Sequence, residues 1–469
     1  MNKIAHLTVF KSLKYPRTKQ WRYLNQRFRT LLHGTRCQIL SYLRFCALCL
    51  AAQKGMIIKM NKVAVIGGGA AGLAAAIAAA RNGAGVVICE KGARAAKKLL
   101  ATGNGRCNMT NINADVKNYH GKNPGFVKGV MHRFWVDETL SFFREIGLLA
   151  KTEEDGRVYP YSLQAAAVSE ILRLETERIG AETICDFDVV RISRKKGMYN
   201  IISRDGRKIS ADCVILACGG KASPNLGSDG SGYPLAESFG HKVTKLYPSL
   251  VQIKTDNTYT KALQGLKING NAVFFENNKK KAESDGEILF TDYGLSGPPI
   301  FNLSRLAAVS KNGRIDIDLM TEFSKDEIFA LLKERKMPDK ALENYFTGML
   351  PKKLGQVLLK ACGIAPLSRR SSSLSTEELS HLADKIKAWS FEIRGTMSWN
   401  NAQVTAGGVE VGDINPSTME SKLSDGLFLA GEILDIDGDC GGYNLQWAWS
   451  SGYIAGMNAA EKSRKGTGI

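Results

Sequence analysis

The sequence lacks a hydrophobic run long enough to cross a membrane as a helix. Such a helix needs about 20 mainly apolar residues, whereas the longest apolar stretch, residues 37–52, has 16 residues and contains Arg44. We therefore expect no membrane-spanning segment and no membrane partner. With 469 residues, of which 44% are hydrophobic and 23% charged, the chain is long enough for two or three globular domains.

Acidic residues are missing from the first part of the chain. Residues 1–59 contain 12 Lys and Arg but no Asp or Glu, which leaves only +7 of the net charge of +19 for residues 60–469. The basic balance is therefore a poor indication of a nucleic-acid partner, and we expect none. The lysine run at residues 279–281 is expected in an exposed hairpin turn. Two interpretations of residues 1–59, which we call the leader, stay open. The leader is either a targeting segment or the result of a translation start placed too far upstream of the true start at Met56 or Met60, and we favour the second interpretation.

Cysteine and histidine are too sparse and too scattered for a metal site or a disulfide framework. The chain has 10 Cys and 6 His, and Cys46 and Cys49 form a C-x-x-C pair without a second pair to complete a zinc site. We predict reduced, mostly buried thiols in a cytoplasmic protein, and no structural metal.

One glycine-rich turn stands between a short apolar run and an alanine-rich stretch. Residues 62–66 have the continuous apolar pattern of a strand in a parallel sheet, and residues 70–82 favour a helix. Gly67, Gly69 and Gly72 therefore form a G-x-G-x-x-G turn from strand to helix. In such turns the first glycine permits the tight turn, the second lets a pyrophosphate approach the backbone, and the third allows close helix packing.

An acidic residue follows the next predicted strand, residues 85–89. This residue, Glu90, comes 18 positions after Gly72, where dinucleotide-binding folds place the acid that binds a ribose. The helix that opens at Ala70 would offer free N–H groups and the positive end of its dipole to the phosphates. The unit predicts a dinucleotide with an unphosphorylated ribose, and it does not separate NAD from FAD.

Two later glycine-rich segments favour a role in ligand binding. Residues 97–111 are too polar and too rich in glycine for a core element, and Arg106 adds a positive charge. Residues 210–220 form an apolar strand pattern that ends in a glycine pair beginning at Gly219, which suits close approach of a ligand. A surface turn stays an alternative for each segment. Cys107 has no cysteine near it in sequence, so we expect it to pack rather than to react.

The C-terminal segment favours a flavin over a nicotinamide. It contains a strand pattern at residues 427–430, the acid Glu432, and then a glycine pair, Gly441 and Gly442, that opens a helix. The N-terminus of a helix bears roughly half a positive charge. This charge suits the negative charge that a reduced isoalloxazine carries at N1 and O2, and a nicotinamide has no such need.

Four motifs together resemble the BaiN/YhiN-type FAD-dependent oxidoreductases, also called aminoacetone oxidase-like flavoproteins. They are GGGAAG with the later Glu-Lys pair, TGNGRCNMTN, GRVYPYSLQAAAV and GEILDIDGDCGGYNLQWAWSSGYIAG, and the resemblance covers about residues 60–457. It implies FAD as the cofactor. The matching positions implied to surround FAD are Gly67, Gly69, Gly72, Glu90, Lys91, Thr102, Gly103, Asn104, Arg106, Asn108, Gly431, Glu432, Gly442, Asn444 and Leu445.

The same resemblance implies the discontinuous FAD domain of the glutathione-reductase-like flavoproteins. We expect an α/β fold in which a Rossmann FAD-binding domain is interrupted by an inserted β domain with a small helical subdomain. Capping-box patterns at residues 324–327 and 375–378 mark two helices of that subdomain. The expected segments are 1–59 (leader), 60–246 (FAD-binding domain, first part), 247–321 (β domain, first part), 322–390 (helical subdomain), 391–409 (return strand of the β domain) and 410–469 (FAD-binding domain, second part).

The first functional hypothesis is an FAD-dependent oxidoreductase that transfers a hydride through flavin N5. Only one G-x-G-x-x-G turn is present, so NAD(P)H would act as a transient reductant, and the resemblance implies a small-molecule substrate, an enone or an amino ketone. Tyr159, Tyr161 and Tyr443 are candidate proton donors, but packing is the commoner role of such residues, and the catalytic residue is left unassigned. The alternatives are an FAD-dependent RNA-modifying enzyme and a non-catalytic flavin sensor.

Overall fold

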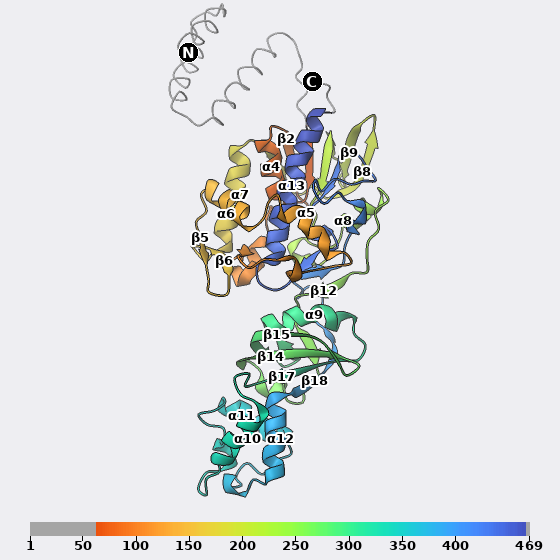
Figure 1. The fold of residues 1–469 in the computed structure, drawn as a ribbon. Coiled ribbons are helices and arrows are strands. Elements are labelled where there is room, and N and C mark those ends of the chain that lie inside the picture. Colours follow the sequence, from red (N-terminus) through yellow and green to blue (C-terminus); the bar gives the residue numbers. More distant parts are fainter. Residues whose placement is uncertain (1–61, 466–469) are drawn as a thin grey trace, which may run out of the picture. The chain divides into compact units, whose positions relative to one another are not determined.

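A parallel five-stranded sheet lies at the centre of the nucleotide-binding part of the chain. The computed structural model describes residues 62–465, and Figure 1 shows their fold. The strand order is β20, β11, β1, β2, β7, and all neighbouring strands are parallel. These strands and two helices of this domain are β1 (Lys62–Ile66), β2 (Gly85–Cys89), β7 (Glu182–Ile184), β11 (Cys213–Leu216), β20 (Leu427–Leu429), α4 (Ala70–Arg81) and α13 (Tyr443–Lys465).

Helices α4 and α13 pack closely side by side (Figure 1). Nine consecutive residues of α4 are buried. Glycines on α13 allow the contact, because a Cβ atom on Gly452 would lie 2.3 Å from the carbonyl oxygen of Ala71. A Cβ atom on Gly456 would likewise lie 2.1 Å from the carbonyl oxygen of Ala75. The C-terminal helix is therefore seated on the helix that follows the glycine turn.

Shorter elements surround this sheet. The antiparallel ladders β10-β9-β8, β3-β6-β5 and β21-β4 consist of β3 (Thr110–Asn111), β4 (Tyr119–His120), β5 (Ala150–Thr152), β6 (Arg157–Pro160), β8 (Val189–Lys195), β9 (Met198–Ser203), β10 (Lys208–Ala211) and β21 (Asp437–Gly438). The other α-helices of this domain are α5 (Lys128–Met131), α6 (Val136–Glu145), α7 (Ala165–Arg178) and α8 (Gly232–Glu237). The 3₁₀ turns are η1 (Leu99–Gly105), η2 (Val116–Asn118), η3 (Pro124–Val127), η4 (Pro224–Leu226), η8 (Val411–Asp413) and η9 (Gly431–Ile433).

A closed six-stranded barrel is inserted in sequence between β11 and β20. Its strands are arranged in the order β13, β16, β15, β14, β17, β18. Because the barrel is closed, each strand pairs with a neighbour on both sides. Strands β12 and β19, which flank the barrel in sequence, pair with each other, and helix α9 packs on β15 and on β12. The elements are β12 (Tyr247–Ser249), β13 (Ile253–Thr255), η5 (Lys261–Leu263), β14 (Lys267–Glu276), β15 (Lys279–Phe290), β16 (Gly294–Ser296), α9 (Pro298–Val309), β17 (Gly313–Asp318), β18 (Trp389–Thr396) and β19 (Val404–Ala406).

A helical subdomain lies in sequence between β17 and β18. It consists of α10 (Lys325–Glu334), η6 (Leu342–Asn344), α11 (Lys352–Ala361), η7 (Ser371–Ser373) and α12 (Thr376–Lys387). The hydroxyl of Ser324 accepts a hydrogen bond from the backbone N–H of Glu327, and Ser375 does the same for Glu378. Both predicted capping boxes are therefore confirmed, and each satisfies N–H groups that a helix start leaves free.

The described residues form two large hydrophobic cores and one small hydrophobic cluster around Ala222, Val251 and Ala402. The first fills the nucleotide-binding domain and includes Trp447 and Trp449. The second is shared by the barrel and the helical subdomain and includes Phe290, Tyr345 and Trp389. None of the helices within residues 62–465 is both long enough and apolar enough to span a bilayer.

The predicted fold class is confirmed: a discontinuous Rossmann domain is interrupted by a β domain with helices attached. One local expectation was wrong: the lysines at 279–281 begin strand β15 instead of forming its turn. Helix α9 lies in the first part of the β domain, where no helix was predicted. The turn is taken by Asn277 and Asn278, both at positive φ, because asparagine tolerates that conformation better than lysine. The leader, residues 1–59, lies outside the described residues.

Candidate functional site

Of the three glycines of the G-x-G-x-x-G motif after β1, the fold requires two and does not require the third. Gly67 has a φ of +105°, and a Cβ atom there would lie 2.5 Å from the carbonyl oxygen of Ala217. A Cβ atom on Gly72 would lie 1.9 Å from the carbonyl oxygen of Gly67. At Gly69, a Cβ atom would meet nothing within 4 Å, and the backbone is extended. No side chain caps α4, which begins at Ala70, so its N-terminus and the space beside Gly69 suit a phosphate.

Glu90 is held beside this turn by backbone N–H groups. Its Oε2 accepts a hydrogen bond from the N–H of Gly68 at 2.8 Å, and its Oε1 accepts one from Gly92 at 2.6 Å. These bonds fix the carboxylate at the end of β2. Each oxygen keeps a second lone pair, so Glu90 can still accept hydrogen bonds from ribose hydroxyls.

Lys91 points to carboxylates of the protein. Its Nζ lies 2.6 Å from Oδ2 of Asp229 and 3.7 Å from Oδ1 of Asp188. Partial burial lowers the pKa of Lys91, but the hydrogen bond to Asp229 together with the charges of Asp229 and Asp188 outweighs burial, so the net effect is a raised pKa. The ammonium group therefore joins segments of the protein beside Glu90.

The loop after β2 has an unusual backbone. Asn104 and Cys107 have φ angles of +54° and +60°, in the left-handed region that residues with a side chain rarely adopt. Thr102 stabilises the loop, because its hydroxyl donates to the carbonyl of Leu99 at 2.6 Å and its carbonyl accepts the N–H of Cys107 at 3.0 Å. Backbone strain of this kind is concentrated at ligand-binding and catalytic sites. Burial raises the pKa of the Cys107 thiol to about 12, which makes it unreactive at neutral pH.

Asn108 places a buried acceptor without a partner in this loop. Its Oδ1 is buried and makes no hydrogen bond within the described residues. Leaving such an atom unpaired costs about 1–3 kcal/mol, so it points to a ligand or an ordered water. A Cβ atom on Gly442 would lie 2.8 Å from this oxygen and 2.5 Å from the carbonyl of Thr110. The start of α13 and the buried acceptor are thus adjacent, and Gly103, whose Cβ would lie 2.8 Å from the N of Asn108, closes the same loop.

Arg106 lies on the outer side of the loop. Its guanidinium carbon is 4.6 Å from the ring centroid of Tyr159, and its Nη1 is 3.6 Å from Oε1 of Glu153. Of the three candidate tyrosines, Tyr161 is 65% exposed, whereas Tyr159 is buried and Tyr443 is half-buried. Burial raises the pKa of both Tyr159 and Tyr443, so both hydroxyls keep their protons at neutral pH.

Glu432 is held by two distant segments. Its Oε1 accepts the N–H of Thr405 at 2.9 Å, and its Oε2 lies 2.7 Å from Nζ of Lys98. A Cβ atom on Gly220 would lie 2.8 Å from Oε1 of Glu432. Gly219, with a φ of +75°, lies against Ser228, whose Oγ would be 3.0 Å from an added Cβ.

The remaining predicted residues shape the C-terminal loop and helix. Gly431 lies against α4, since its Cβ would be 2.7 Å from the Cβ of Ala71. The side-chain amide of Asn444 donates to the carbonyl of Gly438 at 2.7 Å and accepts the N–H of Gly438 at 2.8 Å. Asn444 therefore closes the loop before α13, and its amide is used by the protein itself. Leu445 packs against the first core.

Close contacts join the predicted segments into one site. Gly431 meets α4 of the glycine turn, Gly220 meets Glu432, and Gly442 meets Asn108. The side chains of Lys91 and Arg106 lie at its margins. Three further groups were missed in the sequence, Lys98, Thr405 and Arg157, whose Nε would be 3.8 Å from a Cβ atom on Gly441. No local pattern marks them, because each joins the site through a contact with a residue far away in sequence.

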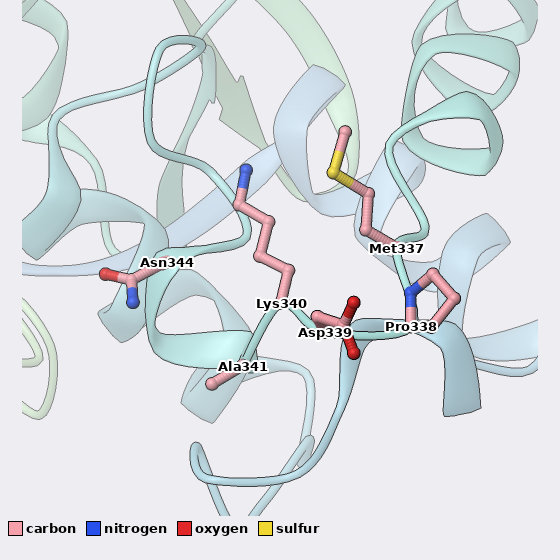
Figure 2. Close-up of a pocket in the computed structure, with 6 residues that line it drawn as sticks. All are labelled: Met337, Pro338, Asp339, Lys340, Ala341 and Asn344. Carbon is pink, nitrogen blue, oxygen red and sulfur yellow. The ribbon is translucent and has the colours of Figure 1, made fainter.

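A cavity of about 680 Å³ lies elsewhere, in the helical subdomain (Figure 2). It is lined by Met337, Pro338, Asp339, Lys340, Ala341 and Asn344. None of the predicted site residues lines it. Within residues 62–465, no group of His, Cys, Asp and Glu side chains is arranged to hold a metal ion.

Comparison with known proteins places the chain in a family. The family described as HI0933-like protein Rossmann domain matches residues 61–458. The 3-dehydro-bile acid delta(4,6)-reductase of Clostridium scindens is 41% identical over 413 residues, which cover 86% of this chain and 100% of that protein.

Two further relatives are named for another substrate. The ribosomal RNA dihydrouridine synthase of Haemophilus influenzae is 31% identical over 85% of this chain and 98% of its own length. The enzyme of the same name from Escherichia coli is 28% identical over 84% of this chain and 96% of its own length. With its Rossmann domain, its glycine turn and these relatives, the chain belongs to the HI0933-like family and is a flavin-dependent oxidoreductase.

Proposed function

We propose that this protein is an FAD-dependent reductase that adds hydrogen to a carbon–carbon double bond conjugated to a carbonyl group, with NAD(P)H as the transient electron donor. The observation that carries the proposal is the turn at Gly69. Its neighbours Gly67 and Gly72 are required by the packing of the chain, whereas the space beside Gly69 is open. A glycine that the fold itself does not need indicates that a ligand requires the close approach.

The residues present fit the adenosine diphosphate half of FAD. The N-terminus of α4 supplies uncapped N–H groups for a pyrophosphate. Glu90, fixed by Gly68 and Gly92, supplies acceptors for the ribose. Lys98 adds a positive charge that is shared with Glu432.

The residues at the other end of the site fit an isoalloxazine. Helix α13 begins at Tyr443, and its first internal bond runs from the N–H of Gln446 to the carbonyl of Gly442. The N–H groups of Tyr443, Asn444 and Leu445 therefore have no acceptor within the helix. They would stabilise negative charge at a pyrimidine ring, and Oδ1 of Asn108 would accept a hydrogen bond from its N–H.

When bound, a flavin supplies hydride transfer through N5, and the chain supplies placement, polarity and protons. Addition of hydrogen to a conjugated double bond also requires a proton at the carbon next to the carbonyl. Tyr159 and Tyr443 hold protons at neutral pH beside the loop and the helix start. Arg157, whose guanidinium pairs with Asp155 at 3.2 Å, lies near Gly441 at this end of the site.

The names of the relatives support this choice of substrate class. A delta(4,6)-reductase of a 3-dehydro-bile acid acts on double bonds conjugated to a ketone, and dihydrouridine is uridine saturated at a double bond conjugated to a carbonyl. The shared chemistry is hydrogen addition to an enone-like system, which favours enones over amino ketones. We extend the proposal to a small-molecule substrate and a cytoplasmic location, as the sequence predicts.

The test begins with the cofactor. Purified protein should be yellow and should release FAD on denaturation, and anaerobic mixing with NADH or NADPH should bleach the flavin. A steroid with a 4-en-3-one group should then be reduced at the double bond, as measured by mass spectrometry. Colourless protein that cannot be reconstituted with FAD would contradict the cofactor, and a reducible flavin that no enone reoxidises would contradict the substrate class.

A second candidate is an RNA-modifying reductase, favoured by the two relatives named ribosomal RNA dihydrouridine synthase. The same hydrogen addition would then act on uridine. The measurement is the dihydrouridine content of unmodified ribosomal RNA after incubation with the protein and NADPH. Dihydrouridine formation without enone turnover would replace the small-molecule proposal with this one.

A further inference from the structure

Two side chains of α9, in the inserted barrel, bind the loop of residues 437–440. This loop precedes the start of α13, where the isoalloxazine of the flavin is proposed to bind. Nε of Arg305 lies 3.2 Å from Oδ1 and 3.2 Å from Oδ2 of Asp437. Oδ1 of Asn302 accepts a hydrogen bond from the backbone N–H of Cys440 at 2.8 Å. Asn302 and Arg305 are three residues apart and so share one face of the helix. Their partners are also three residues apart, and together the four residues form what we call the α9 clamp.

Both contacts of the α9 clamp are specific. Asp437 is only 1% exposed, and the guanidinium of Arg305, with a further contribution from His120, compensates its charge. The amide of Asn302 is oriented from its other end, because its Nδ2 donates to Oγ of Ser284 on β15 at 3.1 Å. Its oxygen is thereby directed to Cys440, and the barrel contributes a preset acceptor to the loop.

The gripped loop continues directly into the start of α13. Gly441 and Gly442 follow Cys440 with φ angles of +144° and +99°. From inside the nucleotide-binding domain, Asn444 fixes the same loop through Gly438. Within the same domain, strand β4 pairs with Asp437 and Gly438. The inserted barrel therefore adds contacts from outside the domain to a loop that its own domain also holds.

We propose that the α9 clamp positions the N-terminus of α13 relative to the flavin. By fixing the 437–440 loop, the inserted barrel sets the orientation of the N–H groups at the start of α13 and thereby the redox potential of bound FAD. Helix N–H groups stabilise negative charge only within about one turn, so a small displacement of this start weakens the interaction. The inference rests on the proposed binding of FAD. It adds that the inserted barrel, which has its own hydrophobic core, changes the redox potential of the FAD bound by the nucleotide-binding domain.

The experiment measures the midpoint potential of bound FAD by dye equilibration in Arg305→Met and Asn302→Ala. Both variants should have a lower potential than the wild type, because reduced FAD loses stabilisation. We expect roughly a tenfold change in the ratio of reduced to oxidised FAD at a fixed potential, about 30 mV for a two-electron couple. Arg305→Lys, which keeps the charge, should restore part of the shift.

The matched control is Arg314→Met. Arg314 also lies on the barrel and pairs with a largely buried carboxylate, Asp316, at 2.8 Å, but both residues belong to β17. Its removal should leave the potential at the wild-type value. Equal potentials in wild type, Asn302→Ala and Arg305→Met would overturn the proposal, whereas wild-type protein without FAD would instead overturn the proposed function.

A second measurement covers variants that fold poorly or lose FAD. Arg305→Met leaves Asp437 buried without its partner, so Arg305→Met combined with Asp437→Asn removes the buried charge as well. Amide hydrogen exchange of a peptide spanning residues 437–446 should be faster in this double variant and in Asn302→Ala than in Arg314→Met. Unchanged exchange of that peptide would show that α9 does not hold the loop and would contradict the proposal.

Discussion

Among single residues, the three glycines of the G-x-G-x-x-G motif have different physical roles. Gly67 avoids a collision with the carbonyl of Ala217, and Gly72 avoids one with the carbonyl of Gly67. Gly69 avoids no contact within the described residues. The motif therefore combines two requirements of folding with one requirement of binding, and substitution can separate them.

Gly69→Val should abolish FAD retention without a large loss of stability. The added side chain would occupy the space proposed for the pyrophosphate but would meet no protein atom at its Cβ. The measurement is the ratio of FAD to protein after purification, together with thermal unfolding of the apoprotein. Gly412→Val is a matched control, because a Cβ atom there also meets nothing within 4 Å. Full FAD content in Gly69→Val would mean that the turn does not bind the cofactor.

At the scale of the element, the pairing of α4 with α13 brings the two ends of the site together. The glycine turn precedes α4, and the Gly441–Gly442 turn precedes α13. The two helices approach so closely that Gly452 and Gly456 face backbone carbonyls of α4. Close packing of small residues therefore fixes the distance between the proposed pyrophosphate and isoalloxazine subsites.

Gly456→Ala should destabilise the protein, although alanine favours helices by about 1 kcal/mol over glycine. Its Cβ would lie 2.1 Å from the carbonyl oxygen of Ala75, and such overpacking typically costs about 1–3 kcal/mol. Urea unfolding monitored by circular dichroism measures the change. Glu461→Ala, at an exposed position of the same helix, is the control and should lose less than about 0.5 kcal/mol. A Gly456→Ala variant as stable as the wild type would show that the helices can separate at little cost.

For the whole molecule, the main feature is that the described residues contain two large hydrophobic cores. The chain passes from the nucleotide-binding domain into the barrel and its helices, and then back into the nucleotide-binding domain. The barrel and its helices lie in sequence between β11 and β20, which are neighbours in one sheet. The sheet of the nucleotide-binding domain is therefore complete only when β20, which follows the barrel in sequence, has paired with β11. Both proposed subsites for FAD lie in the first core domain.

Binding of FAD should therefore protect the two cores unequally. At a free FAD concentration of 100 times Kd, the domain that binds it gains about 2.7 kcal/mol. Hydrogen exchange with and without FAD should slow in α4 and α13 by more than in β17 and α12. Equal slowing in both cores would mean that they unfold as one cooperative unit.

Much of the nucleotide-binding unit is predictable because its signals are local. Strands β1 and β2 have the predicted bounds, and the helix predicted at 70–82 is observed as α4 (Ala70–Arg81). Hydrophobic periodicity, the glycine turn and the capping boxes each depend on residues only a few positions apart. Helix α9 was missed because its apolar stretch lies among β-hairpin patterns, although Pro298 and Pro299 suit the first turn of a helix.

Sequence patterns alone predicted the fold class, the strand–turn–helix unit with Glu90 and the resemblance to a flavoprotein family. Tertiary contacts were needed to show that, of the three motif glycines, only Gly69 borders open space and that Asn108 keeps an unpaired oxygen. They also show that Thr405 and Lys98 hold Glu432 and that α9 binds the 437–440 loop. The physical reason is distance along the chain. Local conformation follows from neighbouring residues, whereas Arg305 and Asp437 are brought together by the packing of two separate cores, for which no local pattern provides a signal.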